Sequence, residues 1–253
     1  MSLFSKQKKT RRKKIPPCSV VIAAAGFSER MRGEDKIFLE INGAPVLVHA
    51  LAAFQGCELV NEIVIIVRGE HVELVCDICK HYGITKASKV VAGGPARSSS
   101  VYNGVFAVSD KAEFIAIHDG ARPCVDQKTI KRAIEAAYKH NASAPAVPIT
   151  YTIKRAKESI VEETVNREGL FEIQTPQVFK SELIKAALTN VMNKSIAVTD
   201  DCEAVEIIGA PVHITEGSHN NIKLTTNEDI VVAEAILAQR GCTIENCELR
   251  DAN

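Results

Sequence analysis

Short apolar runs rich in valine and isoleucine recur along the chain. Five of them have the length of a strand, and they cover residues 19–24, 62–67, 88–93, 114–119 and 144–149. Apolar and polar residues do not alternate within these runs, which is typical of strands covered on both faces by other elements. The runs therefore predict the buried strands of a sheet that is covered on both faces.

Segments with a helical spacing of apolar residues separate the runs. Val101, Val105 and Val108 follow the i, i+4, i+7 spacing of one buried helix face. Helices are predicted over about 45–55, 70–82, 98–108 and 127–140. Strands that alternate with helices across short links are typical of a mostly parallel, twisted sheet with helices on both faces. The predicted fold class is therefore α/β.

The alternation of strands and helices breaks at Thr150. Residues 151–180 are polar, rich in β-branched residues and without a helical period, so they predict a β-arm over about 150–178 that leaves the sheet and returns. Beyond the arm, helices are predicted over about 181–192 and 200–208. A strand is predicted at 212–217, and a last helix begins near Asn227 with acidic residues in its first turn.

Charge is unevenly distributed along the 253 residues. Residues 1–14 hold seven basic residues and no acidic one, so the rest keeps 24 of the 31 basic residues against all 31 acidic ones, a net charge of −7. We expect a basic, disordered tail over 1–17, a single domain over 18–240 and a loose C-terminal tail over 241–253. The basic tail could also bind nucleic acid or anionic lipid, or act as an address signal.

Composition argues against several classes of protein. No apolar stretch approaches the roughly 20 residues that a membrane helix needs. Aromatic residues make up 5% of the chain and are not interleaved with basic ones, which makes nucleic-acid binding by base stacking a poor fit. The eight cysteines are scattered and predict reduced thiols in a cytoplasmic protein. Cys76 and Cys79 have the spacing of half a zinc or redox site, but without a second pair they are better interpreted as helix residues one turn apart.

The first predicted strand ends in small residues that are followed by cations. In open α/β sheets, ligands bind beyond the carboxyl ends of the strands. Ala24, Ala25 and Gly26 would let a flat group lie against the backbone, and Arg30 and Lys36 follow where the phosphates of such a ligand would hang. The segment contains neither a Walker loop nor a dinucleotide fingerprint. By itself it could equally be an ordinary loop with surface charges.

Two further strands end in groups suited to a nucleotide. Gly93 and Gly94 precede the serine-rich start of a helix, where Ser100 and exposed amides suit an anion or the polar edge of a base. Asp119 ends another apolar strand and offers the hard oxygen that suits Mg²⁺ bridging phosphates. The aspartate could instead form an ion pair with Arg122 that fixes a turn.

Two residues near these strand ends have less specific surroundings. Lys223 is predicted on a short apolar strand just before a helix, where it could point into the same crevice or be a solvated strand lysine. His118 is interpreted as structural, because no neighbouring group needs a base.

Eight short motifs occur in one order along residues 18 to 240: AAAGFSERM…K, GG..R..SV..G, HDGARP, TIKRA, VNREG, QTPQ.F, TDD and NIK.T..ED. Each is weak alone, but together they resemble the 2-C-methyl-D-erythritol 4-phosphate cytidylyltransferases of the non-mevalonate isoprenoid pathway. The resemblance implies a Rossmann-like nucleotidyltransferase fold. It also implies an enzyme that uses Mg²⁺ to join CTP to 2-C-methyl-D-erythritol 4-phosphate with release of pyrophosphate, and a homodimer in which the β-arm clasps the second subunit.

The same resemblance implies a role for individual residues. Nucleotide binding falls to Ala24, Ala25, Gly26, Gly94, Ser100 and Ala121. The α-phosphate would be surrounded by the catalytic cations Arg30, Lys36 and Lys223, and the metal would be held by Asp119. Substrate contacts fall to Arg122 and, on the arm, to Thr152, Arg167 and Thr175, with Arg167 reaching into the neighbouring subunit's site. Because the attacking phosphate is already ionised at neutral pH, no general base is required.

The chain departs from the family pattern in two places. The family commonly places proline before the catalytic lysine and glutamine after it, whereas Asp35 and Ile37 flank Lys36 here. Asp35 could partly neutralise Lys36 or make the loop more mobile. The basic tail is also not part of the pattern.

Three alternative functions stay open at this point. A relative that makes CDP-ribitol from ribitol 5-phosphate shares the nucleotide motifs, and only the arm motifs TIKRA and VNREG favour the erythritol enzyme. A nucleic-acid-binding module anchored by residues 1–14 and an inactive scaffold on the same fold are the others. The joint presence of Arg30, Lys36, Asp119 and Lys223 argues against the scaffold.

Overall fold

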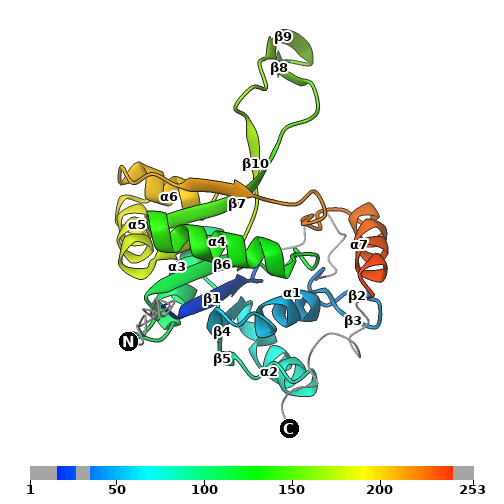
Figure 1. Ribbon diagram of the computed structural model, residues 1–253, viewed down its shortest axis with the longest axis vertical. Coiled ribbons are helices and arrows are strands. Elements are labelled where there is room, and N and C mark those ends of the chain that lie inside the picture. Colours follow the sequence, from blue (N-terminus) through cyan, green and yellow to red (C-terminus); the bar gives the residue numbers. More distant parts are fainter. Residues whose placement is uncertain (1–15, 27–34, 242–253) are drawn as a thin grey trace, which may run out of the picture.

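The computed structural model of the protein describes residues 16–26 and 35–241. The basic tail and the predicted Arg30 therefore lie outside the described residues. Within them, the central sheet contains β1 (Cys18–Ala23), β4 (Val60–Val67), β5 (Ala87–Ala92), β6 (Phe114–Asp119), β7 (Ala142–Pro148), β10 (Phe171–Ile173), β11 (Gln177–Lys180) and β12 (His213–Glu216). The strand order is β10-β7-β11-β6-β1-β4-β5, with β12 beside β7. The succession of β7, β6, β1, β4 and β5 can be followed in Figure 1.

The central strands run parallel, as predicted. β1 pairs in parallel with β4 on one side and β6 on the other, and β4 pairs in parallel with β5. β11 lies antiparallel between β6 and β7, and β10 lies antiparallel to β7. The α/β class is confirmed, but the sequence pattern did not separate β10 and β11 from the arm. The strand predicted around Lys223 is wrong, since residues 221–224 have no strand structure.

Helices cover both faces of the sheet because successive strand residues point to opposite sides. Val20 and Ile22 of β1 face α1 (Val46–Gln55), α2 (Val72–His81) and α4 (Gln127–His140). Val21 faces α3 (Arg97–Ala107), α5 (Ser181–Lys194) and α6 (Asp201–Ile207). α7 (Glu228–Gln239) packs in a smaller cluster around Leu224, near the short strands β2 (Glu40–Ile41) and β3 (Ala44–Pro45). None of the helices among the described residues is both long and apolar enough to cross a membrane.

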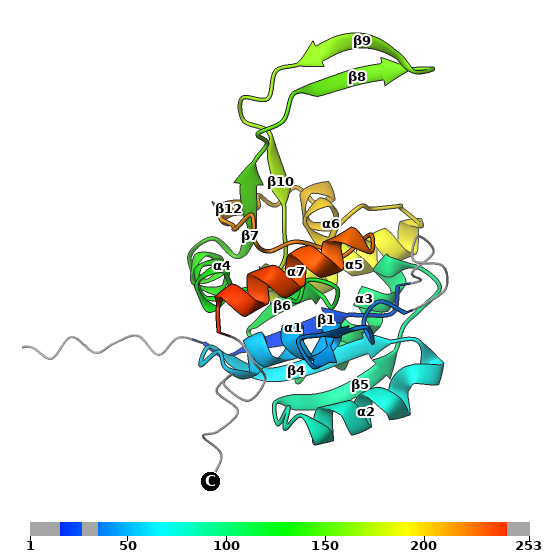
Figure 2. The same cartoon turned by 90° about the vertical axis from the view of Figure 1, so that its right-hand side faces the viewer.

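The predicted arm is a hairpin that stands away from the body of the molecule. It is formed by β8 (Ile153–Lys157) and β9 (Ile160–Val165), which pair antiparallel (Figures 1 and 2). The chain leaves the sheet after β7 and returns to it through β10 and β11. Cys76 and Cys79 both lie on α2, as interpreted from their spacing, and they are free thiols.

The topology creates a crevice beside the end of β1. From β1 the chain builds β4 and β5 on one side and then crosses to β6 on the other, so the carboxyl ends of β1 and β6 flank the point where the strand order reverses. Backbone hydrogen bonds continue past the strand ends: Ala24 N donates to Ile66 O over 2.8 Å, and Gly120 N donates to Ala23 O over 2.9 Å. These bonds hold the residues that follow β1 and β6 at the edge of the sheet.

Candidate functional site

A cavity of about 240 Å³ opens at the carboxyl ends of β1, β5 and β6. Its wall combines small residues from the strand ends with charged side chains. The cavity is lined by Ala23, Ala24, Ala25, Gly26, Lys36, Ile37, Gly94, Pro95, Ala96, Arg97, Ser100, Asp119, Ala121 and Lys223. All the predicted nucleotide-binding residues therefore meet here, together with Lys36, Asp119 and Lys223.

The predicted substrate residues are distributed differently. Arg122 is buried behind Asp119. Thr152, just before β8, and Arg167, between β9 and β10, are exposed at the root of the arm and do not line the cavity. Thr175 does not lie on the arm, because it occupies the turn between β10 and β11, where it is 4% exposed.

Glycine at position 93 lets the ends of β5 and β1 approach each other. A Cβ atom on Gly93 would lie 2.6 Å from Ala25 Cβ and 2.8 Å from Ser100 Oγ, closer than side-chain carbons normally come. The Ser100 hydroxyl accepts from Gly94 N over 3.0 Å and lies 2.8 Å from Ala96 O, to which it donates. Ser100 thus fixes the loop that forms one wall of the cavity.

The carboxylate of Asp119 is surrounded by cations. It lies 2.9 Å from Lys223 Nζ, 3.5 Å from Arg122 Nε and 3.8 Å from Arg97 Nη2. Burial alone would raise the pKa of Asp119, but the surrounding cations, Lys223 first, overcome that effect and hold the pKa well below its ordinary value. Asp119 is therefore ionised at neutral pH.

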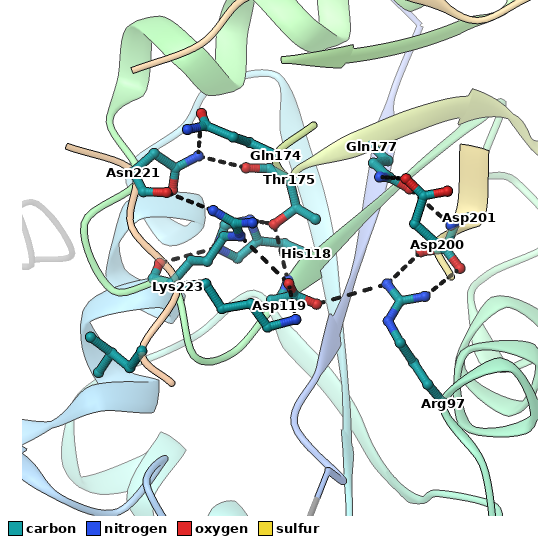
Figure 3. Close-up of polar contacts among 12 residues, drawn as sticks. Arg97, His118, Asp119, Gln174, Thr175, Gln177, Asp200, Asp201, Asn221 and Lys223 are labelled. Atoms are coloured by element: carbon teal, nitrogen blue, oxygen red, sulfur yellow. Dashed lines mark hydrogen bonds and ion pairs between the residues drawn. The ribbon is translucent and has the colours of Figure 1, made fainter. Parts of the chain in front are cut away.

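Arg97 and Asp201 form a bidentate ion pair that the sequence analysis missed. Arg97 Nη1 and Nη2 donate to the two carboxylate oxygens of Asp201 over 3.1 and 2.7 Å, and Asp201 is fully buried (Figure 3). Gln177 Oε1 accepts from Asp201 N, while the Gln177 amide donates to Asp200, the N-cap of α6. The signals available in the sequence were a basic residue three positions after Gly94 and an acidic pair at a predicted helix start.

His118 is structural, as interpreted from the sequence. Its Nε2 lies 3.2 Å from Arg122 O, a carbonyl that can only accept, so Nε2 carries the proton of the neutral ring. Nδ1 then accepts from the Thr175 hydroxyl over 2.9 Å, and Thr175 Oγ1 accepts from Asp119 N over 3.2 Å. Burial lowers the pKa of His118 to about 4, which keeps the ring neutral. Thr175 therefore supports the backbone of Asp119 from behind the cavity.

The two lysines of the cavity are linked through residues 221–224. Leu224 N donates to Ala121 O over 2.8 Å, which joins this segment to the loop after β6. Lys36 Nζ donates to Leu224 O over 2.9 Å. Arg122 Nη1 donates to the buried Asn221 O over 2.7 Å, which anchors the other end of the segment. These contacts bring Lys36 and Lys223 to one side of the cavity.

The donor groups of the cavity suit a magnesium ion that arrives with phosphates. Asp119 offers one ionised carboxylate, and among residues 16–26 and 35–241 no cluster of three or more histidine, cysteine or acidic side chains could hold a metal by itself. Mg²⁺ is commonly bound through one or two carboxylates together with substrate phosphates and water. Asp119 fits that kind of site and not an all-protein cage.

A Rossmann-like nucleotidyltransferase presents two surfaces to a nucleoside triphosphate. The base lies against small residues, and the phosphates meet cations gathered around a carboxylate. Residues 18–239 match the model of the family described as 2-C-methyl-D-erythritol 4-phosphate cytidylyltransferase. The chain belongs to this family, so it is a nucleotidyltransferase, and the resemblance seen in the motifs is confirmed.

Curated proteins and solved structures agree with the family match. The chain is 44% identical over 223 residues to the 2-C-methyl-D-erythritol 4-phosphate cytidylyltransferase of Halalkalibacterium halodurans, covering 88% of this chain and 97% of the relative. It is 43% identical over 222 residues to the enzyme of the same name from Caldanaerobacter subterraneus, covering 87% of this chain and 98% of that one.

Among solved structures, 4-diphosphocytidyl-2C-methyl-D-erythritol synthase from Anaerococcus prevotii superposes with a TM-score of 0.78 at 29% identity, over 89% of this chain and 100% of the other. The 2-C-methyl-D-erythritol 4-phosphate cytidylyltransferase from Thermus thermophilus gives a TM-score of 0.72 at 29% identity, over 87% and 98%. These names support the erythritol enzyme and give no support to the CDP-ribitol alternative.

Proposed function

We propose that this chain joins CTP to 2-C-methyl-D-erythritol 4-phosphate and releases pyrophosphate, with the reaction taking place in the cavity at the ends of β1, β5 and β6. The observation that carries this proposal is the meeting of Lys36, Asp119 and Lys223 with a wall of small residues at one switch point of the sheet. The match of residues 18–239 to the cytidylyltransferase family supports the same reaction.

The small residues form the nucleotide side of the site. Cytosine and ribose would lie against Ala24, Ala25 and Gly26, with the base edge read by Gly94 and Ser100 and the ribose bordered by Ala121. Support comes from the position of all six in the cavity wall. Because glycine and alanine leave the backbone accessible, its N–H and C=O groups can recognise the base directly.

Charge stabilisation and positioning carry the chemistry. An oxygen of the sugar phosphate forms a new bond to the α-phosphorus of CTP, and the bond from that phosphorus to pyrophosphate breaks. Lys36 and Lys223 would face the charge that develops on the α-phosphate, with Arg30 as the third cation. No side chain has to remove a proton from the nucleophile, which agrees with the neutral, buried imidazole of His118, the residue before Asp119.

Asp119 would hold Mg²⁺ when the nucleotide is bound. The ion would supply positive charge that neutralises the phosphates. Asp119 is ionised and opens onto the cavity, so its carboxylate is available once a triphosphate competes for Lys223.

The arm would complete the substrate site in a homodimer. Its exposed apolar side chains include Tyr151, Ile160 and Val161, which are 82%, 71% and 57% exposed. An isolated two-stranded hairpin is marginally stable in water, so a partner surface that covers these residues would stabilise it. Thr152 and Arg167 would then meet the sugar phosphate in the neighbouring subunit's cavity, while Arg122 would border the substrate in its own.

A reducing compartment fits the thiols. Cys18, Cys57, Cys76, Cys79, Cys124 and Cys202 are free, most of them buried. We therefore propose a cytoplasmic protein.

Pyrophosphate release by the purified full chain tests the proposed reaction. Four nucleoside triphosphates would be combined in turn with 2-C-methyl-D-erythritol 4-phosphate and with ribitol 5-phosphate, in the presence of Mg²⁺. We expect turnover with CTP and the erythritol phosphate. Faster turnover with ribitol 5-phosphate, or with another nucleotide, would overturn the proposal.

A further inference from the structure

Lys36 follows an acidic residue whose side chain is committed elsewhere. Asp35 Oδ2 lies 3.0 Å from Arg68 Nη2 and 3.4 Å from His71 Nδ1. The Asp35 side chain is 10% exposed, so the carboxylate is held in a largely desolvated position. This contact requires an acidic side chain at position 35.

Arg68 and His71 are anchored to the sheet that carries the cavity. Arg68 directly follows β4, the neighbour of β1, and His71 ends the short 3₁₀ helix η2 (Gly69–His71). The Val67 carbonyl at the end of β4 accepts from Gly93 N over 2.8 Å, so this strand end is also joined to the glycine loop of the cavity. Asp35 thus binds to residues that directly follow a central strand of the sheet.

The residues that follow Lys36 are held at the same place. Phe38 N donates to Asp35 O over 2.9 Å, closing a turn around Lys36, and the Phe38 ring meets the His71 ring edge-on at 4.8 Å between centroids. Leu47 N donates to Ile37 O over 3.0 Å, which ties the turn to α1. Contacts on both sides of Lys36 therefore converge on Arg68 and His71.

We propose that Asp35, Arg68 and His71 form a latch that positions Lys36 in the cavity. The latch fixes the backbone on either side of Lys36, and the ammonium group then reaches Leu224 O, next to the cavity residue Lys223. Arg68 Nη2 also offsets part of the negative charge of Asp35 next to Lys36. Asp35 is a positioning residue in this inference, which rests on the proposed function for its kinetic consequence.

The kinetic test compares Asp35→Asn in two backgrounds. Misplacing a catalytic group by about 1 Å can cost up to about 100-fold in rate, so we expect Asp35→Asn to lower kcat by about 10-fold or more and to change the KM for CTP less. In a Lys36→Ala background the same substitution should have no further effect, because the group that it positions is gone. A loss of equal size in both backgrounds would overturn the latch.

Glu70→Gln is the matched control. Glu70 also pairs with Arg68, over 3.3 Å at Nη1, but its side chain is 61% exposed and the pair leaves the Asp35 contact intact. We expect its kcat to equal that of the wild type. Arg68→Gln should reproduce the loss of Asp35→Asn, and the double variant should lose no more than either single one. Additive losses would contradict a shared role.

A second readout does not depend on turnover. Covalent labelling of lysine amines, followed residue by residue by mass spectrometry, should be faster at Lys36 in Asp35→Asn than in the wild type, with Lys223 as internal reference. Faster labelling in a protein that turns over neither substrate pair would support the latch and overturn the proposed function. Unchanged labelling together with unchanged kcat would overturn the latch and leave the function standing.

Discussion

Lys223 Nζ lies 2.9 Å from Asp119 Oδ2, so a cation from the segment before α7 meets a carboxylate from the end of β6 across the cavity. Asp119 does not serve Lys223 alone, since Arg97 and Arg122 also face its carboxylate. Lys36 lines the same cavity, and with it the cations outnumber the carboxylates of Asp119, Asp200 and Asp201 by four to three, which leaves an excess of positive charge. A triphosphate with its metal would restore the balance, which is a physical reason for this site to bind one.

Removal of either lysine should slow the reaction without unfolding the protein. Lys223→Ala and Lys36→Ala each remove a charge expected to face the α-phosphate, so kcat should fall by about 100-fold or more. Lys128→Ala, at an exposed position of α4, serves as control and should keep wild-type activity. Pyrophosphate release measures all three, and near-normal turnover in a cavity variant would remove that lysine from the mechanism.

Asp119→Asn should abolish the contribution of Mg²⁺ to the binding of CTP. Ligands that bind the folded state raise Tm, and at a fixed concentration a tighter ligand raises it more, so in the wild type CTP with Mg²⁺ should raise Tm more than CTP alone. In Asp119→Asn the two shifts should become equal, because the carboxylate proposed to hold the ion is gone. Asp110→Asn, at an exposed position, should behave like the wild type. A persistent effect of Mg²⁺ in Asp119→Asn would show that the ion is held elsewhere.

The sheet and the small-residue wall could be predicted because they depend on local pattern. Strands such as β1 and β4 are buried on both faces, so their apolar runs are continuous and easy to recognise. β10 and β11 are three and four residues long and follow a polar arm. They are too short for a pattern of apolar residues to be recognised. The prediction of a strand at Lys223 was wrong because the hydrogen bond from Leu224 N to Ala121 O is not part of a β-sheet.

The ion-pair network could not be derived from sequence, because its partners meet only in the fold. Arg97 begins α3, and Asp201 begins α6, and neither spacing nor composition links the two positions. Thr175 was expected on the arm because it follows the polar stretch. Its partners, His118 and Asp119, belong to β6, which the chain had left long before.

His118 should make stability fall under mildly acidic conditions. Its pKa is about 4 in the folded chain and ordinarily 6.5, so between these values the unfolded chain binds a proton that the folded chain does not. The free energy of unfolding therefore decreases as pH is lowered through this window, with about 2 kcal/mol lost between about pH 7 and pH 5. Denaturant unfolding of wild type and His118→Gln at both pH values would isolate this contribution. Equal losses in the two proteins would contradict it.

Gly104 should be needed for the close contact of α3 with the sheet. A Cβ atom there would lie 2.5 Å from Ile66 Cδ1 and 2.7 Å from Val21 Cγ1, both in the core. Alanine favours a helix by about 1 kcal/mol over glycine, but overpacking costs about 1–3 kcal/mol, so Gly104→Ala should lower stability. Gly69→Ala is the matched control, since no atom lies within 4 Å of its added Cβ. Thermal unfolding compares the two, and a stabilised Gly104→Ala would show that the helix can shift.

Arg167 provides a test of whether two subunits share each site. In the single chain it donates to Thr150 O at the root of the arm and does not line the cavity. If it acts in the partner's cavity, Arg167→Ala should be nearly inactive by itself, as Lys36→Ala should be. A mixed dimer of the two variants would then contain one cavity with both residues intact.

Mixing the two inactive variants should therefore restore activity. With random exchange, half of the dimers are mixed and one of their two cavities is complete, so about one quarter of wild-type activity should return. Lys36→Ala mixed with Lys223→Ala is the control and should restore none, because both residues belong to the same chain's cavity. Absence of restoration in the Arg167→Ala mixture, with dimers verified by sedimentation, would place Arg167 in its own subunit's site. Restoration of activity in the control mixture as well would remove the support for a shared site.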